Sequence, residues 1–255
     1  MLKTRWLQGT PTAEVPKGPV LPDRFRGRPE LHPERCQDGC RACAAACPTE
    51  AISLDPLRLD LGACLFCGAC EEACPGGAIR FTPDHRLAAS KRADLVLHDS
   101  ETPMVAALDE RMRSLFGRSL KLRQVAAGDC SGCAAELAAL GNVVFDLGRF
   151  GVQFVASPRH ADGLVITGPV TGNMRSALQD AYAATPSPRI VIAVGACAIS
   201  GGPFRGSPLA SDGVPSDVPV DLYVPGCPPH PLTMLDGLLR LLDRLSADRA
   251  RAGGR

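Results

Sequence analysis

The apolar residues of the C-terminal half form short β-type runs that alternate with longer helical runs. Helices are predicted at Ala134–Leu140, Asn173–Ala184 and Pro231–Leu245, the last with its leucines on one face. Five strands are predicted, at Leu120–Ala127, Val152–Ala156, Gly163–Gly168, Arg189–Gly195 and Val220–Val224. Alternation of this kind is typical of a doubly wound, mostly parallel sheet. Residues 120–247 are therefore predicted to form an α/β domain.

The segments around this domain have weaker patterns. Residues 83–119 are predicted to be a linker with an amphipathic helix, which would begin at Thr102 and Pro103 and end before Gly117. Residues 1–35 are rich in Pro and Gly and are predicted to form an extended arm. This arm is either a disordered tail or a segment laid along a partner, with Trp6 and Phe25 available for burial. Residues 248–255 are predicted to be a frayed tail.

Cysteine is the most informative residue type, because 12 of the 255 residues are Cys and most of them are grouped. Eight fall between Cys36 and Cys74, which favours metal or cofactor ligation over disulfides in a reducing compartment. Two similar units are present, and each ends in Cys-Pro, two further residues and Ala-Ile, at Cys47–Ile52 and Cys74–Ile79. Residues 36–82 are therefore predicted to form one domain built from a duplicated, cysteine-rich unit.

The second unit has the spacing C-x2-C-x2-C-x3-C-P, which ends at Pro75 and is specific for iron–sulfur clusters. Its fourth Cys ligates the other cluster of the pair. The first unit has three residues between Cys36 and Cys40, so the geometry and potential of that cluster are left open. Cluster one is predicted to use Cys36, Cys40, Cys43 and Cys74. Cluster two is predicted to use Cys64, Cys67, Cys70 and Cys47. Two zinc sites are the alternative, which the run of four Cys with a trailing Pro disfavours.

The four remaining cysteines follow predicted strands. Because the carboxyl ends of parallel strands line the crevice where cofactors bind, these thiols are expected to meet there. We predict a third four-thiolate [4Fe-4S] cluster from Cys130, Cys133, Cys197 and Cys227. The alternatives are a redox-active dithiol, since Cys130 and Cys133 form a C-x-x-C pair, or inert buried cysteines.

Charge and composition exclude several classes of function. The formal net charge is +1 and aromatic residues make up 4%, which does not fit a nucleic-acid binder. The longest apolar stretch, Ile190–Ile199, has about half of the roughly 20 residues that span a bilayer. The N-terminus does not have the apolar run of a secretory signal. A cytoplasmic location is therefore expected.

The cysteine motifs and their surroundings carry a family resemblance. Residues 120–247 resemble the small subunit of energy-converting, membrane-associated [NiFe] hydrogenases of the formate hydrogenlyase type, and the homologous B (20 kDa) subunit of NADH–quinone oxidoreductase (complex I). The matching motifs are Asp129–Glu136, Phe150–Asp162, Gly168–Thr171, Gly195–Gly202 and Pro225–Pro229. Residues 24–80 resemble the dicluster ferredoxin subunit of the same complexes, with Phe25–Pro29 among the matches, which implies an α+β dicluster ferredoxin-like domain at residues 36–82. Two normally separate subunits are therefore expected to be fused.

The resemblance implies a flavodoxin-like fold and an electron-transfer role, without a complete active site on this chain. The cluster at Cys130 would be the proximal one, facing a catalytic large subunit. Membrane subunits and a redox donor, such as a ferredoxin or a formate dehydrogenase, are the other implied partners, on the inner face of the cytoplasmic membrane. The C-x-x-C pair matches the hydrogenases, whereas the complex I subunit has adjacent cysteines in this motif. The alternatives are a quinone-reducing, complex-I-like module and a free-standing polyferredoxin carrier.

Polar residues give weaker signals. Glu136 matches a family carboxylate and is a possible proton relay, or simply an acid that suits the N-terminal part of a helix. Arg159, His160 and Asp162 are expected to form a local polar network rather than to contact a large subunit or a quinone. Arg41, beside Cys40, is expected to be exposed.

Overall fold

The computed structural model describes residues 6–7, 9, 11–15, 21–98, 105, 114–116 and 119–243. Its C-terminal part is a five-stranded parallel sheet in the order β10-β9-β8-β6-β7. Numbered along the chain, this is the order 2-1-3-4-5 of doubly wound, flavodoxin-like folds, which confirms the predicted fold class. The strands lie within about two residues of the predicted bounds, at β6 (Leu120–Ala126), β7 (Val152–Phe154), β8 (Gly163–Thr167), β9 (Ile190–Val194) and β10 (Leu222–Val224).

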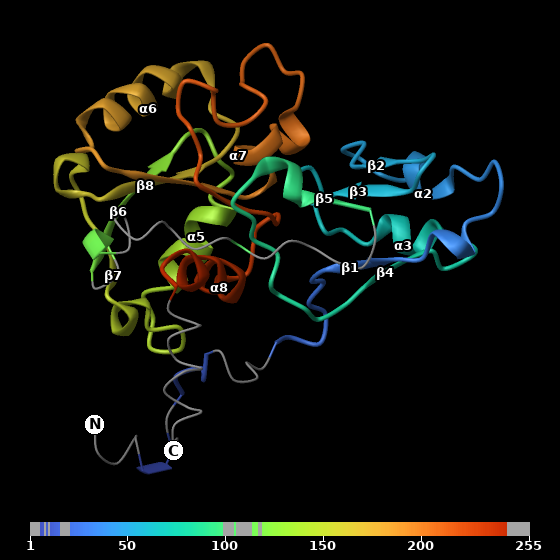
Figure 1. Ribbon diagram of the computed structural model, residues 1–255, viewed down its shortest axis with the longest axis horizontal. Coiled ribbons are helices and arrows are strands. Elements are labelled where there is room, and N and C mark those ends of the chain that lie inside the picture. Colours follow the sequence, from blue (N-terminus) through green and yellow to red (C-terminus); the bar gives the residue numbers. More distant parts are fainter. Residues whose placement is uncertain are drawn as a thin grey trace.

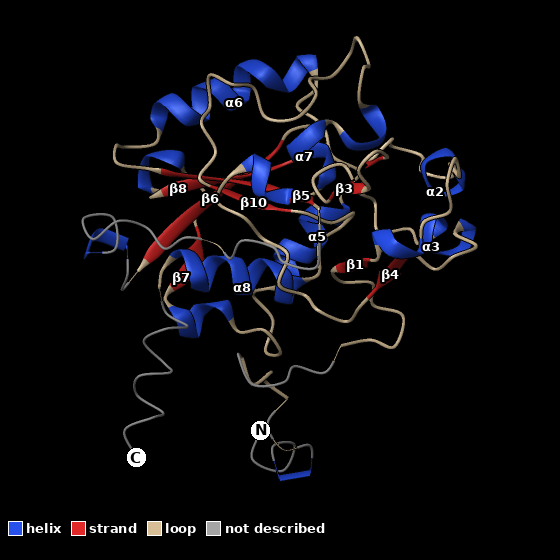
Figure 2. Cartoon of the chain, turned by 45° about the vertical axis from the view of Figure 1, so that its right-hand side comes forward, coloured by secondary structure: helices blue, strands red, loops and turns tan. Residues whose placement is uncertain are grey.

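Helices cover both faces of this sheet (Figures 1 and 2). Helix α6 (Gly172–Ala184) packs on one face, while α5 (Gly132–Ala139) and α8 (Pro231–Leu241) lie together on the other. Every residue of β8 and of β9 is buried, as expected for central strands covered on both sides. A short helix, α7 (Ala196–Ser200), follows β9 directly.

The N-terminal part combines two small antiparallel sheets with two short helices. Strand β1 (Pro29–Leu31) pairs with β4 (Ile79–Phe81), and β3 (Arg58–Asp60) lies between β2 (Ile52–Ser53) and β5 (Val96–Leu97). The duplication is visible in the fold, because a cysteine helix precedes a strand in each unit: α2 (Ala42–Ala45) before β2, and α3 (Ala69–Ala73) before β4. Strands β1 and β5 complete these sheets from outside residues 36–82. The 3-10 turns are η1 (Pro33–Arg35), η2 (Arg92–Leu95), η3 (Leu147–Phe150), η4 (Pro158–His160) and η5 (Gly202–Phe204).

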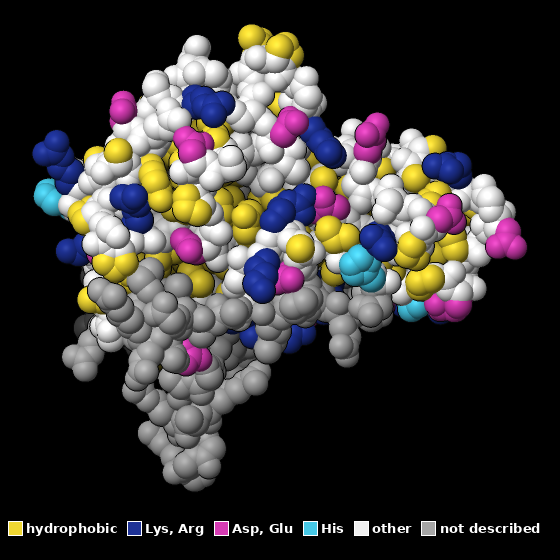
Figure 3. Space-filling view, turned by 45° about the horizontal axis from the view of Figure 1, so that its top comes forward, with side chains coloured by type: hydrophobic (Ala, Val, Ile, Leu, Met, Phe, Trp, Pro, Cys, Tyr) yellow, Lys and Arg dark blue, Asp and Glu magenta, His cyan; other side chains and the backbone are white. Residues whose placement is uncertain are grey.

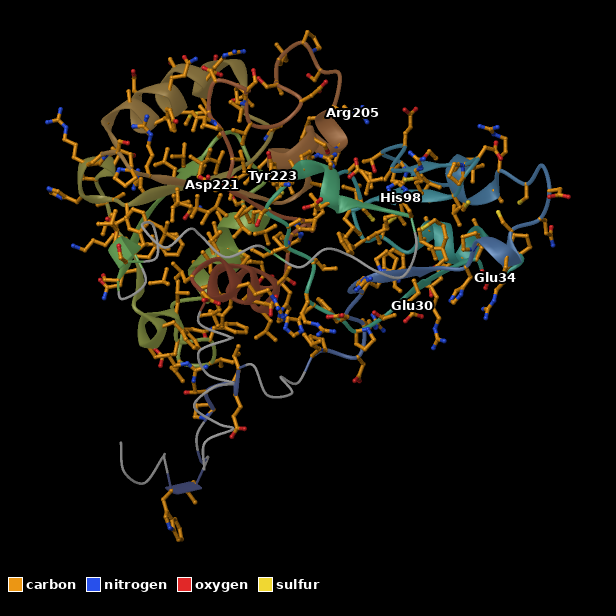
Figure 4. The ribbon with its side chains drawn as sticks, in the orientation of Figure 1. Glu30, Glu34, His98, Arg205, Asp221 and Tyr223 are labelled. Carbon is orange, nitrogen blue, oxygen red and sulfur yellow. The ribbon has the colours of Figure 1, made fainter. Side chains whose placement is uncertain are left out.

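The two parts of the chain share a hydrophobic core. Leu59 and Leu61 of the ferredoxin-like part are fully buried in a cluster that also contains Ala193, Ala198 and Ile199. The linker adds a backbone pairing, because Ala89 exchanges two hydrogen bonds with Tyr223 on the edge strand β10. Figure 4 shows Tyr223 near the middle of the molecule, whereas the side with Glu30 and Glu34 lies away from the parallel sheet.

Part of the predicted N-terminal arm lies against the chain's own C-terminal part. The Ala13 amide donates to the Val144 carbonyl (2.7 Å), Thr12 Oγ1 donates to the Val143 carbonyl (2.9 Å), and Val15 packs against the main core. The predicted helix beginning at Thr102 lies mostly outside the described residues, and its described part, residues 114–116, is helical. The tail 248–255 also lies outside the described residues. In the part that the structure describes, no helix is long and apolar enough to cross a membrane.

Candidate functional site

The twelve cysteines lie in loops and on short helices. Among the residues that the structure describes, no three His, Cys, Asp or Glu side chains meet closely enough to hold a single metal ion. The thiols nevertheless gather into three groups, as indicated by the cavities that they line and by the effect of neighbouring thiolate charges on the pKa of several of them.

The third group lies at the carboxyl ends of the parallel strands. Cys130 and Cys133 follow β6, Cys197 lies in α7 directly after β9, and Cys227 follows β10. Burial raises the pKa of Cys133 to about 12, and the charges of the other three thiolates raise it as well. The pKa of Cys197 is raised to about 11, by burial and then by Cys227 and Cys130. The structure therefore brings all four together, as expected from their positions after the strands.

Glycines let the backbone close around this group. A Cβ atom on Gly195 would lie 2.5 Å from Cys133 Sγ, and one on Gly202 would lie 3.1 Å from Cys197 Sγ. Gly195 also has φ +89°, a conformation that favours glycine. Any larger residue at these two positions would therefore collide with the cysteine residues of this group. A compact multi-thiolate centre fits this arrangement.

Asp129 anchors the loop that carries Cys130, a role that sequence reasoning did not assign to it. Its Oδ2 accepts a hydrogen bond from Thr167 Oγ1 at the end of β8 (2.5 Å), and its Oδ1 accepts one from the Ser131 amide (3.2 Å). The signal in the sequence is its place directly before Cys130 in the quoted motif. The Asp129 carboxylate also adds to the negative charge around Cys133 and Cys197.

The second group contains one thiol from the first unit. Cys64, Cys67 and Cys70 line a single cavity together with Cys47, and the other walls include Ile52, Leu59 and Phe81. Burial raises the pKa of Cys64 to about 12, and the charges of Cys70, Cys47 and Cys67 raise it further. Burial also raises the pKa of Cys70 to about 11, again with Cys47 and Cys67. The four residues predicted for cluster two are thus brought together in a mostly apolar pocket.

The first group, in turn, contains one thiol from the second unit. Burial raises the pKa of Cys43, and the charges of Cys74 and Cys36 raise it further, so a thiol of the second unit lies beside two of the first. Cys36 and Cys40 line a cavity with Gly39 and Arg41. Gly39 takes φ +73°, so the additional residue of this loop is accommodated in a left-handed turn. Arg41 is exposed at the rim, as expected.

Backbone amides point at sulfur atoms in both units. The Ala51 amide donates to Cys47 Sγ (3.2 Å) and the Ala78 amide donates to Cys74 Sγ (3.2 Å), four residues after the Cys in each case. The Phe66 amide donates to Cys64 Sγ (3.3 Å). Hydrogen bonds of this kind stabilise thiolates and tune the potential of a centre that they ligate.

A cavity of about 250 Å³ is lined by residues next to both the second and the third group. Leu65 and Phe66 follow Cys64 of the second group, whereas Cys227 belongs to the third, and Glu136 lines the same cavity. Burial raises the pKa of Glu136. This carboxyl group is therefore close to the third group and easier to protonate than an exposed glutamate. His230 also lines the cavity, where burial lowers its pKa.

The three polar residues of the loop before β8 lie at the other end of the sheet. Asp162 Oδ2 accepts a hydrogen bond from the Lys121 amide near the start of β6 (2.7 Å), and the Asp162 carbonyl accepts one from the Ile190 amide (3.1 Å). Arg159 and His160 are exposed. Asp162 thus joins strand ends locally, through its carboxylate and its carbonyl, and none of the three residues lines a cavity described for the cysteines. A polar network of all three stays a prediction.

Comparison with known proteins assigns both parts of the chain. Residues 130–241 match the family of the NADH ubiquinone oxidoreductase 20 kDa subunit, and residues 28–80 match the 4Fe-4S dicluster domain. A probable membrane-bound hydrogenase subunit of Pyrococcus furiosus is 42% identical over 142 residues, which is 54% of this chain and 85% of that protein. The B subunit of an NADH-quinone oxidoreductase of Citrifermentans bemidjiense is 45% identical, over 48% of this chain and 71% of that protein.

Among solved structures, a chain of the membrane-bound sulfane sulfur reductase, an archaeal respiratory membrane complex, is 30% identical. The match covers 56% of this chain and 79% of that chain, with a TM-score of 0.47. The N-terminal match identifies a domain for [4Fe-4S] clusters. The chain therefore belongs to the family of the 20 kDa subunit of NADH ubiquinone oxidoreductase, to which the membrane-bound hydrogenase subunit is related, and it carries a 4Fe-4S dicluster domain fused ahead of that subunit.

Proposed function

We propose that this chain is the electron-transfer subunit of a membrane-associated, [NiFe]-hydrogenase-like complex of the formate hydrogenlyase type, and that it carries three [4Fe-4S] clusters. Cluster one would be held by Cys36, Cys40, Cys43 and Cys74. Cluster two would be held by Cys64, Cys67, Cys70 and Cys47. The proximal cluster would be held by Cys130, Cys133, Cys197 and Cys227. Each cluster, when bound, supplies a one-electron redox centre.

The grouping of the thiols is the observation that supports this proposal. Cys47 shares a cavity with the thiols of the second unit, and Cys74 lies beside those of the first. This exchange is the pattern of a two-cluster ferredoxin. The relatives that match the C-terminal part are named as hydrogenase and NADH-quinone oxidoreductase subunits.

The chain's own residues place, bury and shield the clusters. Cys64 and Cys70 are buried, so the apolar walls of their cavity shield this side of cluster two from water, whereas Cys67 is exposed. A position of cluster two next to the proximal cluster is supported by the shared core and by the cavity that Leu65, Phe66 and Cys227 line. Cluster one would then lie beside α2, which Figure 1 shows at the end of the molecule away from the parallel sheet. The proposed order of electron transfer is proximal cluster, cluster two, cluster one, or the reverse.

Exposure at the two ends of this relay fits docking of partners. Cys130 and Cys227 are exposed, so the proximal cluster would be open on one side until a catalytic large subunit covers it. Cys36 and Cys40 are partly exposed, which leaves cluster one accessible to a donor such as a ferredoxin or a formate dehydrogenase.

Membrane subunits of the same complex would hold the assembly at the inner face of the cytoplasmic membrane. The domains we propose are 36–82 for the ferredoxin part and 120–247 for the C-terminal part.

A complex-I-like module that reduces a quinone is the second candidate. It is favoured by the relatives that are named as B subunits of NADH-quinone oxidoreductase, one of which is 48% identical over 110 residues. The two candidates differ in the large subunit, because only the hydrogenase type holds nickel there.

Metal analysis of the complex purified through a tag on this chain tests the proposal. We expect about 12 irons and as many sulfides per chain beyond those of the partners, three reducible signals in electron paramagnetic resonance (EPR), and one nickel per large subunit. A large subunit without nickel would favour the quinone-reducing module. A monomer in size-exclusion chromatography, or zinc in place of iron, would contradict the proposal.

A further inference from the structure

Arg26 lies against the loop between Cys67 and Cys70. A Cβ atom placed on Gly68 would be 2.6 Å from Arg26 Nε and 2.9 Å from Cζ, so the guanidinium group is in contact with the backbone of this loop. Gly68 has φ +83° and precedes α3, which carries Cys70. The positive charge is therefore seated directly beside the second thiol group.

The same arginine also faces the third thiol group. Arg26 lines the cavity of about 250 Å³ that Cys227 of the third group also lines, and Arg24 lines it as well. The cavity lined by Cys36 and Cys40 does not include Arg26. Arg26 thus contacts the loop of the second group and shares a cavity with a thiol of the third, but not the cavity of the first.

The chain on both sides of Arg26 is held in place. The Phe25 ring packs edge-on against the His230 ring, with centroids 5.4 Å apart and the planes at 72°. On the other side, the Gly27 amide donates to the Thr82 carbonyl (2.7 Å) and the Arg28 amide donates to the Asp84 carbonyl (2.8 Å). These contacts fix the backbone at Arg26 relative to both parts of the molecule.

The exposed Arg26 side chain is not paired with a carboxylate of the described residues, although Glu136 lines the same cavity. Arg86, Arg92 and Arg240 form ion pairs with Asp84, Asp60 and Asp236, whereas Arg26 forms no ion pair in the described ranges. Each four-thiolate [4Fe-4S] centre is an anion, and reduction adds one more negative charge to it. A nearby fixed cation stabilises the reduced form and raises the reduction potential.

We propose that Arg26 is a shared electrostatic residue, which raises the reduction potentials of cluster two and of the proximal cluster together and leaves cluster one almost unaffected. This inference rests on the proposed function, because it requires both clusters. A cation beside both sites stabilises the electron in either of them. It therefore favours the reduced state of both clusters at the interface between the domains.

An EPR-monitored redox titration of the full chain in its complex tests this inference. We expect Arg26→Gln to lower the midpoint potentials of two of the three clusters, and Arg26→Lys to restore most of both shifts, because it keeps the charge. Arg159→Gln is the matched control, since Arg159 is exposed at the amino end of the sheet, and we expect it to shift none of the three.

The iron content separates this test from that of the proposed function. Wild-type protein without three clusters would overturn the proposed function. Arg26→Gln protein with full iron content and three unchanged potentials, or with only one shifted, would overturn the shared role of Arg26. If Arg26→Gln loses iron, Arg26→Met takes its place, because methionine keeps an apolar side chain against Gly68. Arg26→Met is then compared with Arg26→Lys, and the same results support or overturn the inference.

Discussion

Ser200 donates its hydroxyl hydrogen to the carbonyl oxygen of Gly62 over 2.9 Å. This bond joins the helix that contains Cys197 to the loop just before Cys64, and Ser200 is buried where the two parts of the chain meet. The contact is tight as well, because a Cβ atom on Gly62 would lie 2.7 Å from Ile199 Cγ2. One hydrogen bond thus connects the loops that lead to two neighbouring thiol groups.

Replacement of Ser200 by alanine is expected to loosen this junction. The variant leaves the buried Gly62 carbonyl without its partner, which costs about 1–3 kcal/mol. The thermal unfolding midpoint of the cluster-loaded protein should fall, measured at a fixed scan rate by circular dichroism. Ser157→Ala is the control, because the Ser157 side chain forms no capping hydrogen bond. Equal midpoints for Ser200→Ala and the wild type would contradict the expectation.

The exchange of ligands between the two units predicts which variants resemble one another. Cys47→Ser should remove or alter the same EPR signal as Cys64→Ser, although Cys47 belongs to the first unit in sequence. Cys74→Ser should in turn affect the same signal as Cys43→Ser. The reason is that Cys47 shares a cavity with Cys64, while Cys74 lies beside Cys43. If Cys47→Ser and Cys43→Ser remove the same signal, the exchanged ligand sets are wrong.

Gly195 is expected to be essential for the proximal cluster alone. In Gly195→Ala, the added methyl group would lie 2.5 Å from Cys133 Sγ, and φ +89° strains any residue with a side chain. We expect about eight irons per chain instead of about 12, with both ferredoxin-type signals retained. Gly141→Ala is a suitable control, since its Cβ would meet only the Ala138 carbonyl at 3.5 Å. Full iron content in Gly195→Ala would disprove the expected clash.

Glu136 is expected to couple the proximal potential to pH. Burial raises the pKa of this carboxyl group, and a nearby centre that gains an electron should raise it further. Reduction is then accompanied by proton uptake, so the midpoint potential should fall as pH rises through the raised pKa range. The midpoint potential should be independent of pH at pH values below the Glu136 pKa of the oxidised protein, and again at pH values above the Glu136 pKa of the reduced protein. In Glu136→Gln the midpoint potential should be independent of pH in the range between these two pKa values. Asp180→Asn, on the exposed side of α6, is the control and should keep the pH dependence of the wild type. An unchanged slope in Glu136→Gln would exclude this role.

The sequence pattern predicted the parallel sheet well and the small elements poorly. Long buried strands such as β9 stand out because all their residues are apolar. Helix α7 was missed, because its five residues are small or apolar and continue the run of β9 without a polar break. The pairing of β1 with β4 was also missed, since Pro29 and Phe81 are far apart in sequence and each strand has only three residues.

Residues with recurrent spacing were predicted more readily than residues that meet only through folding. Cysteine spacing and position after strands predicted three sets of four thiols, and the structure brings members of each set together. Arg26 had no such signal, because its contact with Gly68 and its place in the cavity that Cys227 also lines depend on how the two parts of the chain pack. The surface seen in Figure 3 gives no further guidance, because Lys and Arg side chains are interspersed there with Asp and Glu.

The hydrogen bonds that join Thr12 and Ala13 to the segment at Val143 and Val144 have a consequence for biogenesis. During translation, residues 12 and 13 leave the ribosome well before residues 143 and 144 are synthesised. This N-terminal contact can therefore form only after the whole ferredoxin-like part and the first strands of the parallel sheet have emerged, so it is among the late steps in the assembly of the chain.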